Sequence, residues 1–298
     1  QAGVKGVYVE KPFCRTPAEA DLVREACRKS GTKVAVAHRN CYHPVLGIVL
    51  KLVEDGAIGR LLEIRGRGKG DRRGGAEDLW VLGSHIMDIF RFLAGDPVHC
   101  SAEMLKAGKP VTWEHVYDGA EGLGPLAGDE LHARFRMANG TTATFDSIAN
   151  DGTANFGYGL QLVGSGGIIS IHADRDPRAY LVRGNPFARP GEPRKWTPIT
   201  TAGVGQPENK PELIRKIHEH VVAVEDLLAA VDGGHEPVCG LEDGAATVEM
   251  ICAVFESHRQ GGRAVSFPLK ERGNALAGMQ REGSKQTSSG SGDRSGKK

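Results

Sequence analysis

The first 42 residues alternate between short apolar runs and one amphipathic stretch. Gly6–Val9 is a short apolar run, and Thr16–Glu19 then opens a helix, with threonine and glutamate at capping-box spacing and proline at the first helical position. The helix ends at Gly31, and a second apolar run covers residues 34–37. A strand, a helix and a strand of these lengths predict a right-handed βαβ crossover in a parallel sheet.

Two helices and a strand are predicted next. A helix begins after Pro44 and ends at Asp55-Gly56, and residues 61–67 alternate between apolar and polar side chains as a strand does. A further helix covers about residues 79–94, because apolar residues recur there at helical spacing up to the terminating Gly95-Asp96-Pro97.

The middle of the chain changes to strict alternation. Residues 131–137 and 143–145 alternate around Asn139-Gly140, which predicts a hairpin with a type I′ turn. Further strands are predicted at about 158–163, 168–172 and 179–183. Consecutive strands joined by short turns indicate a mainly antiparallel sheet, so this part differs in class from the first.

Two long amphipathic helices close the predicted fold, one over residues 214–231 and one over residues 241–255. Residues 273–298 are rich in Gly, Ser, Lys and Arg and have no apolar periodicity. A segment of this composition buries too little apolar surface to order itself. We therefore expect a disordered tail, whose deletion leaves the melting temperature and any activity unchanged.

Charge and cysteine usage exclude several classes of protein. The chain has 38 Lys and Arg against 37 Asp and Glu, which gives no argument for nucleic acid or an anionic membrane as a partner. No apolar run reaches the roughly 18 residues of a membrane helix. The six cysteines are scattered without a C-x-x-C pair, which indicates reduced, mostly buried thiols. We expect a cytoplasmic protein, and a chain that begins at Gln1 leaves a signal peptide open.

Two places carry candidate chemistry. Lys11 directly follows the first strand, and ligands of open parallel sheets bind beyond the carboxyl ends of the strands. The alternative is a solvated loop lysine. His85 lies within the helix at 79–94, with Asp88 three residues later and Asp78 two turns earlier. A histidine with a carboxylate on its face suits proton transfer at neutral pH.

Each of these residues also has a structural interpretation. For His85 taken alone, a core histidine bonded to the backbone is the favoured interpretation. Asp78 fits a helix N-cap, and Asp88 fits a buried hydrogen-bonding residue. His38, His43 and His85 lie on different elements without ligand spacing, so the sequence predicts no metal site.

Four segments, in this order, resemble the motifs of one enzyme family. They are a G-x-x-x-E-K-P run with a following E-A helix, a G-G…G-x-H-x-x-D run, a strand ending in G-S-x-G, and a G-R-x-V-x-x-P-L ending, at residues 6–20, 74–88, 159–167 and 262–269. Together they resemble the Gfo/Idh/MocA family of oxidoreductases, the glucose–fructose oxidoreductase and inositol dehydrogenase type, over nearly all of residues 1–272.

The resemblance implies an α/β protein with two domains. Residues 1–42 would be the C-terminal part of an NAD(P)-binding Rossmann domain. Residues 43–272 would form an α+β domain that binds substrate and makes the oligomer contact through a large, mainly antiparallel sheet. Residues 273–298 would be the tail. The partners implied are a sugar or polyol substrate and a second copy of the chain, as a dimer or tetramer, with neither nucleic acid nor membrane.

The resemblance also implies a reaction and its residues. Hydride would pass between NAD or NADP and a carbinol carbon of a sugar, inositol or related polyol. Lys11 and His85 match the family's catalytic lysine and histidine, and Lys11-Pro12 is a candidate cis peptide. Asp78 is the acid expected to assist His85. The residues expected at the cofactor are Glu10, Lys11, Pro12, His38 and Asn40.

Two departures from the family pattern stand out. The family's aspartate four residues before the histidine is Val81 here, so Asp78 or Glu77 must substitute for it if the pair is kept. The G-x-G-x-x-G fingerprint is missing, and on the order of 90 residues would precede Gln1 to complete the dinucleotide-binding half. We therefore expect a chain truncated at its N-terminus.

Two alternative functions stay open. One is an NAD-dependent glycosidase of the same family, in which the redox step is transient. The other is a non-catalytic binding or regulatory homologue, for which Val81 is the best argument. The residue that would decide between NAD and NADP lies outside this sequence.

Overall fold

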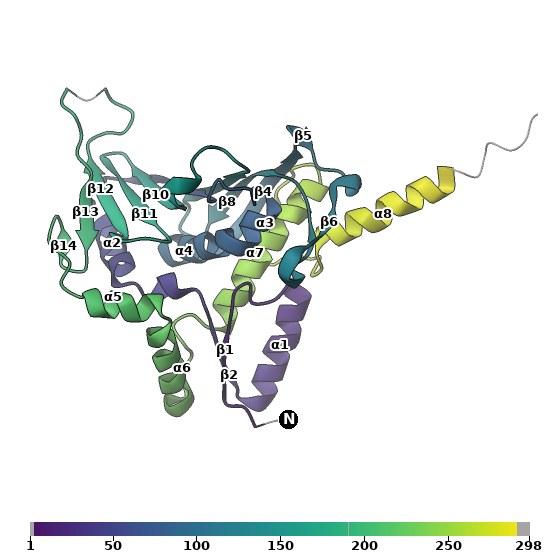
Figure 1. Ribbon diagram of the computed structural model, residues 1–298, viewed down its shortest axis with the longest axis horizontal. Coiled ribbons are helices and arrows are strands. Elements are labelled where there is room, and N and C mark those ends of the chain that lie inside the picture. The colour runs from purple at the N-terminus through teal and green to yellow at the C-terminus, as the bar shows by residue number, and fades with distance from the viewer. Residues whose placement is uncertain (1–2, 190, 291–298) are drawn as a thin grey trace, which may run out of the picture.

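The computed structural model describes residues 3–189 and 191–290 (Figure 1). A large sheet lies above a layer of helices, and a small parallel strand pair projects below them. This arrangement confirms the expected α/β class with a large, mainly antiparallel sheet.

The projecting unit is the predicted βαβ crossover. β1 (Gly6–Val9) pairs in parallel with β2 (Lys33–Val36), and α1 (Pro17–Ser30) connects them. The Thr16 hydroxyl accepts from the Glu19 amide at 3.1 Å, while the Glu19 carboxylate accepts from the Arg15 amide instead of closing the capping box. Gly31 ends the helix in the left-handed conformation, at φ 72°.

Eleven of the described strands form the large sheet. Its order is β14-β13-β12-β11-β10-β3-β9-β8-β4-β15, with β5 paired to β4. Neighbours pair antiparallel except β3 and β9, which are parallel. The strands are β3 (Leu61–Arg67), β4 (Pro97–Lys106), β5 (Lys109–Pro110), β8 (Glu130–Met137), β9 (Thr142–Ile148), β10 (Gly159–Gly164), β11 (Gly167–His172), β12 (Ala179–Arg183), β13 (Thr197–Thr200), β14 (Gly203–Val204) and β15 (Val265–Ser266). A separate small hairpin pairs β6 (Tyr117–Gly119) with β7 (Gly124–Leu126).

Helices α4 (Ser84–Ala94) and α7 (Leu241–Arg259) cover one face of this sheet, and α2 (Pro44–Glu54) packs near its β13 end (Figure 1). The approach of α4 is close because β3 carries Gly66 at the crossing. A Cβ on Gly66 would lie 2.6 Å from Cζ of Phe90. This contact fixes the helix that carries His85 against the sheet.

The helix predicted at about 79–94 is extended and interrupted. It starts with one turn, α3 (Ala76–Asp78), passes through a π-helical turn, η2 (Leu79–Gly83), and continues as α4. A π turn adds a residue to the helical repeat, so positions before it no longer share a face with His85 at the ordinary spacing.

Two local predictions were wrong. The 139–140 hairpin is not type I′, because only Gly140 has positive φ. Met137 O accepts from the Gly140 amide, and the Met137 amide donates to Thr141 O, as in a type I turn followed by a bulge. The helix predicted at 214–231 is two helices, α5 (Pro211–His218) and α6 (Val221–Gly233), because His220 adopts the left-handed conformation between them.

The expectation of a disordered tail was wrong for residues 275–290, which form α8 (Ala275–Gly290). Leu276 is fully buried and Ala275 nearly so, and Gln280 Nε2 donates to Val116 O at 3.0 Å. The polar composition of residues 273–298 gave no indication that two apolar residues at the start of this helix are buried. Residues 291–298 of the expected tail lie outside the described residues.

Candidate active site

Lys11 leaves the carboxyl end of β1 and reaches the helix that carries His85. The Lys11-Pro12 peptide is cis, as the family resemblance implies. The Lys11 ammonium donates to the backbone carbonyl of Val81 at 2.5 Å. Val81 lies in the π turn one turn before His85, so the structure brings the two predicted catalytic residues to the same helical segment.

His85 is enclosed by aromatic rings. Its side chain is 7% exposed and its Nδ1 has no hydrogen-bond partner among the described residues. The His38 ring packs edge-on at a centroid distance of 5.6 Å, and the Tyr158 ring lies at 6.4 Å. The Nδ1 atom of His85 is therefore not held by a backbone group of the described residues, unlike in the core histidine of the structural interpretation.

Burial shifts the pKa of His85 and that of Lys11 in the same direction, downward. Burial lowers the pKa of His85 well below its usual value, and the neighbouring His38 and Lys11 lower it further. Burial also lowers the pKa of Lys11, against the raising effect of Glu10. Near neutral pH the imidazole is neutral, and the environment of Lys11 eases loss of its proton.

The hydrogen bonds of Asp78 go to residues other than His85. Its Oδ2 accepts from the Ser147 hydroxyl at 2.6 Å and from the Lys69 amide at 3.1 Å, so it fastens the start of this helix to β9. Burial raises the pKa of Asp78, while these hydrogen bonds lower it. The π turn lies between Asp78 and His85 in the sequence, and the role of Asp78 as the acid partner stays a prediction.

His38 and Asn40 follow β2, on the same side as Lys11. Asn40 Oδ1 accepts from the buried Arg178 at 3.1 Å, and its Nδ2 has no partner among the described residues. His38 is fully buried, and its Nδ1 lies 3.8 Å from Oδ1 of Asp88. Burial lowers the pKa of His38 to about 3 and raises that of Asp88 to about 7, so this contact is not a conventional ion pair at neutral pH.

A second polar cluster surrounds Asp176, and Arg178 connects it to Asn40. Asp176 accepts from His43 Nε2 at 3.1 Å and from His218 Nε2 at 2.6 Å, and Arg178 Nε lies 3.5 Å away. Burial alone would raise the pKa of Asp176, but the two histidine hydrogen bonds and Arg178 outweigh it and lower that pKa. This cluster joins the loop after β11 to α5.

Sequence reasoning missed some neighbours of the site. Tyr158, which is 7% exposed, precedes β10, and Arg39 lies in the short helix η1 (Arg39–Tyr42). Burial raises the pKa of Tyr158 to about 12 and lowers that of His85, and the positive charge of Arg39 acts to lower both. Neither residue belongs to a recognisable motif, and only the fold places residues so far apart in sequence around one histidine.

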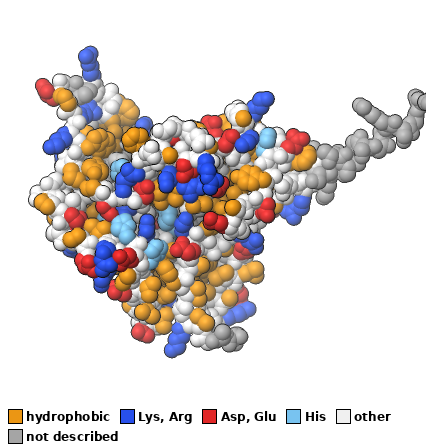
Figure 2. Space-filling model, viewed as in Figure 1, with side chains coloured by type: hydrophobic (Ala, Val, Ile, Leu, Met, Phe, Trp, Pro, Cys, Tyr) orange, Lys and Arg blue, Asp and Glu red, His pale blue; other side chains and the backbone are white. Residues whose placement is uncertain are grey.

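Figure 2 shows histidine and charged side chains across the middle of this face, between the sheet and the β1–β2 unit. Apolar side chains gather below them, over the β1–β2 unit. The exposed apolar residues of this unit include Val4, Val7 and Leu22, and α6 beside it exposes Leu228.

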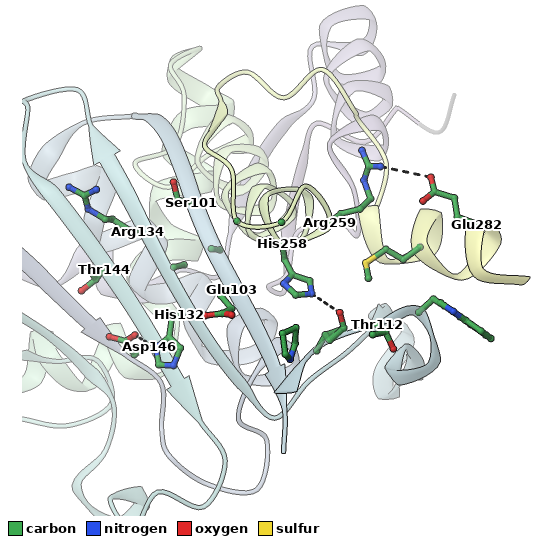
Figure 3. Close-up of a pocket in the computed structure, with 18 of the residues that line it drawn as sticks. Ser101, Glu103, Thr112, His132, Arg134, Thr144, Asp146, His258, Arg259 and Glu282 are labelled. Atoms are coloured by element: carbon green, nitrogen blue, oxygen red, sulfur yellow. Dashed lines mark hydrogen bonds and ion pairs between the residues drawn. The ribbon is translucent and has the colours of Figure 1, made fainter. Parts of the chain in front are cut away.

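The opposite face of the sheet carries a different hollow, of about 920 Å³ (Figure 3). His132 and Asp146 line it from β8 and β9, and His258 Nε2 contacts Val111 O at 3.0 Å. Arg259 points toward Glu282 of α8. None of the predicted catalytic residues lines this hollow, so the candidate active site lies elsewhere.

Comparison with known families and proteins places the chain among oxidoreductases. The model of the C-terminal alpha/beta domain of an oxidoreductase family, GFO_IDH_MocA, matches residues 51–267. The match spans most of the large sheet with α4 and α7. No helix among the described residues is long and apolar enough to cross a membrane.

Two curated proteins are similar in sequence. A levoglucosan dehydrogenase of Pseudarthrobacter phenanthrenivorans is 23% identical over 290 residues, which cover 85% of this chain and 72% of that protein. A D-apiose dehydrogenase of Paraburkholderia graminis is 31% identical over 129 residues, 39% of this chain and 33% of that protein.

Solved structures share the fold. Levoglucosan dehydrogenase in complex with NADH and levoglucosan superposes with a TM-score of 0.64 at 21% identity, over 89% of this chain and 74% of that one. An inositol dehydrogenase homologue from Azotobacter vinelandii, in complex with NADH and myo-inositol, gives 0.63 at 18% identity over 89% and 72%.

Proposed function

The chain belongs to the Gfo/Idh/MocA oxidoreductase family, and from that premise we propose that it is an NAD(P)-dependent dehydrogenase of a sugar, inositol or related polyol. The observation that carries the proposal is the placement of Lys11 and His85. A lysine from the carboxyl end of a parallel strand is bonded to the helical turn that precedes a buried histidine.

The similar proteins support this substrate class. The curated relatives are named for levoglucosan and D-apiose, and structural neighbours hold NADH with levoglucosan or myo-inositol. All of these substrates are polyhydroxylated, so the proposed reaction is oxidation of a CH–OH group or its reverse.

The residues present fit the nicotinamide end of a dinucleotide. Asn40 Nδ2 and His85 Nδ1 are buried polar atoms without a partner among residues 3–189 and 191–290, and both lie near the carboxyl ends of β1 and β2. The β1–α1 connection contains no glycine, so it does not form a glycine-rich turn for the pyrophosphate. Glu10, Lys11, Pro12, His38 and Asn40 are the residues proposed to hold the cofactor.

When bound, the dinucleotide would supply the hydride acceptor or donor. His85 would take the proton from the substrate hydroxyl, because its lowered pKa keeps the imidazole neutral and able to accept. Lys11 would bind the same oxygen and stabilise its developing negative charge. The two side chains thus divide the work on one C–OH group.

Val81 does not remove the anchor of Lys11. The ammonium is held by the backbone carbonyl of Val81, which any residue at this position would offer. Val81 differs from the family's aspartate in having no titratable side chain that could assist His85. The catalytic role predicted for Asp78 has less support, because its Oδ2 accepts hydrogen bonds from the Ser147 hydroxyl and the Lys69 amide.

The domain division is also a proposal. We infer that residues 1–42 belong to a larger Rossmann sheet, with residues 43–272 as the substrate and oligomer domain. Exposed apolar residues flank β1 and its helices, including Leu22 at 72% and Leu228 at 60% exposure. The sheet face opposite α4 and α7 is the proposed contact with a second copy.

The test is turnover by the full-length protein with NAD+ or NADP+ and a panel of monosaccharides, anhydrosugars and inositols. Stoichiometric cofactor reduction by at least one of them supports the proposal. Product formation without net cofactor turnover would point to the glycosidase alternative. Dinucleotide or sugar binding without any turnover would overturn the proposal in favour of a non-catalytic homologue.

A further inference from the structure

Three buried ligating side chains from distant segments meet behind His85. They are His38 after β2, Asp88 on α4, and Cys239 just before α7, and one ligating atom of each lies within 4.8 Å of the others. Each of the three residues is buried. Side chains of this chemistry rarely gather in a core without a structural reason.

A fourth side chain joins this cluster. The Cys41 thiol donates to Oδ2 of Asp88 at 2.7 Å and lies within hydrogen-bonding reach of Cys239. Both cysteines are free thiols. Cys41 lies in η1 and His38 caps the start of that helix, so the four side chains come from three segments: η1 with its cap, α4 and the turn before α7.

The polar atoms of the cluster are poorly satisfied. Neither ring nitrogen of His38 has a hydrogen-bond partner among the described residues, although its side chain is fully buried. The Asp88 carboxylate forms no ion pair with a lysine or arginine in that part of the chain; its close contacts are the Cys41 thiol and, at 3.8 Å, the His38 ring. An unbonded buried imidazole beside an uncompensated carboxyl group is costly unless something binds both.

We propose that His38, Cys41, Asp88 and Cys239 bind a structural zinc ion. Zinc takes four ligands in tetrahedral geometry from cysteine sulfur, histidine nitrogen and carboxylate oxygen, at about 2.0–2.3 Å. The bond lengths of such a site place its ligand atoms roughly 3–4 Å apart. The atoms of His38, Asp88 and Cys239, within 4.8 Å of one another, would draw together slightly, and the Cys41 thiol, now 2.7 Å from Asp88 Oδ2, would move away from that oxygen. Mg²⁺ and Ca²⁺ prefer all-oxygen sites, which this set does not offer.

The position predicts what the ion does. His38, Asp88 and Cys239 are buried and Cys41 is half-buried, and a site closed by four protein ligands is the pattern of structural rather than catalytic zinc. Asp88 lies one turn after His85 on α4, and the His38 ring packs against His85. The ion would therefore join the β1–β2 unit to α4 and hold His85 from behind. His38 has two ring nitrogens, so binding zinc through one leaves the other for the cofactor side.

The first test needs no variant and no activity. Zinc per chain is measured by mass spectrometry on the full-length protein, and the metal-stripped protein is then titrated with Co²⁺. One zinc per chain, and tetrahedral cobalt bands with a thiolate charge-transfer band at one equivalent, support the proposal. A protein that purifies without zinc and gives no thiolate–cobalt band overturns it, and so does a Cys41–Cys239 disulfide found by thiol counting in denaturant.

Variants assign the ligands. Cys239→Ser and Cys41→Ser should each weaken the thiolate–cobalt band, and Asp88→Asn should weaken Co²⁺ binding by at least about tenfold, as loss of a metal partner does. The matched control is Cys100→Ala, which removes a buried thiol outside the cluster and should leave the spectrum unchanged. If Cys41→Ser and Cys239→Ser fold by circular dichroism yet keep the wild-type cobalt spectrum, the site is not theirs.

Discussion

Lys11 and His85 are connected through the backbone of Val81. The Lys11 ammonium donates to the Val81 carbonyl at 2.5 Å, and His85 follows one turn later on a buried helix. The contact crosses from the β1–β2 unit to the helix layer, so it aligns the lysine with the histidine while leaving position 81 free to vary. A valine there is therefore compatible with a working lysine.

Removal of either side chain should abolish most turnover. We expect His85→Ala and Lys11→Ala each to lower kcat by at least about 10²-fold, the usual effect of losing a proton-transfer or charge-stabilising group. The measurement is steady-state cofactor reduction with whichever sugar the panel identifies. His235→Ala and Lys51→Ala, at exposed positions, are the matched controls and should keep wild-type rates. Normal turnover by His85→Ala would rule out the proposed mechanism.

A carboxylate at position 81 should move the pH profile. In Val81→Asp the new charge lies one turn before His85 and favours the protonated imidazole, so the pKa of His85 rises. The neutral, proton-accepting form is then lost at a higher pH, and the acid limb of kcat/KM shifts upward. Val81→Asn matches the shape without the charge and should leave the limb in place. Equal profiles for the two variants would mean that His85 is not the titrating base.

Substitution of Asp78 should affect stability more than turnover, in contrast to substitution of His85. Its carboxylate bonds Ser147 and the Lys69 amide, and Asp78→Asn keeps one oxygen to accept from them. We expect the variant to lose stability while its kcat falls much less than that of His85→Ala. A loss in kcat equal to that of His85→Ala, in a folded protein, would restore Asp78 as the acid partner.

Local sequence signals predicted much of the fold because they act over a few residues. The Thr16 cap, the left-handed Gly31 and the alternation of β8 and β9 are each decided within one turn or one strand pair. The failures have a different cause. The His220 break and the π turn before His85 depend on packing against distant segments, which periodicity does not record. The residues of the site divide in the same way. Motif resemblance identified Lys11 and His85. Sequence spacing could not show that His38, Cys41, Asp88 and Cys239 lie close together, because the fold brings them from separate parts of the chain.

The Asp176 cluster should make the protein sensitive to acid. The pKa of Asp176 is lowered in the folded state, so its contribution to stability is present above the unfolded value of about 3.9 and is lost as the pH falls below it. We expect the free energy of unfolding to drop through that range, and Asp176→Asn to show a shallower drop from a lower starting stability. Urea unfolding at a series of acidic pH values measures both. A variant with the wild-type slope would mean that other carboxylates dominate acid unfolding.

The anchored start of α8 makes the C-terminal segment necessary for stability. Leu276 is fully buried, and Gln280 bonds the backbone of Val116, so deletion of residues 273–298 removes core contacts and not only a solvated tail. Leu276→Ala alone should lower the free energy of unfolding by about 2–5 kcal/mol, as large-to-small changes in a packed core do. Arg281→Ala, at an exposed position of the same helix, should change it by less than about 0.5 kcal/mol. Chemical denaturation of the three proteins decides the matter. A deletion variant as stable as the full chain would show that α8 does not pack on the core in solution.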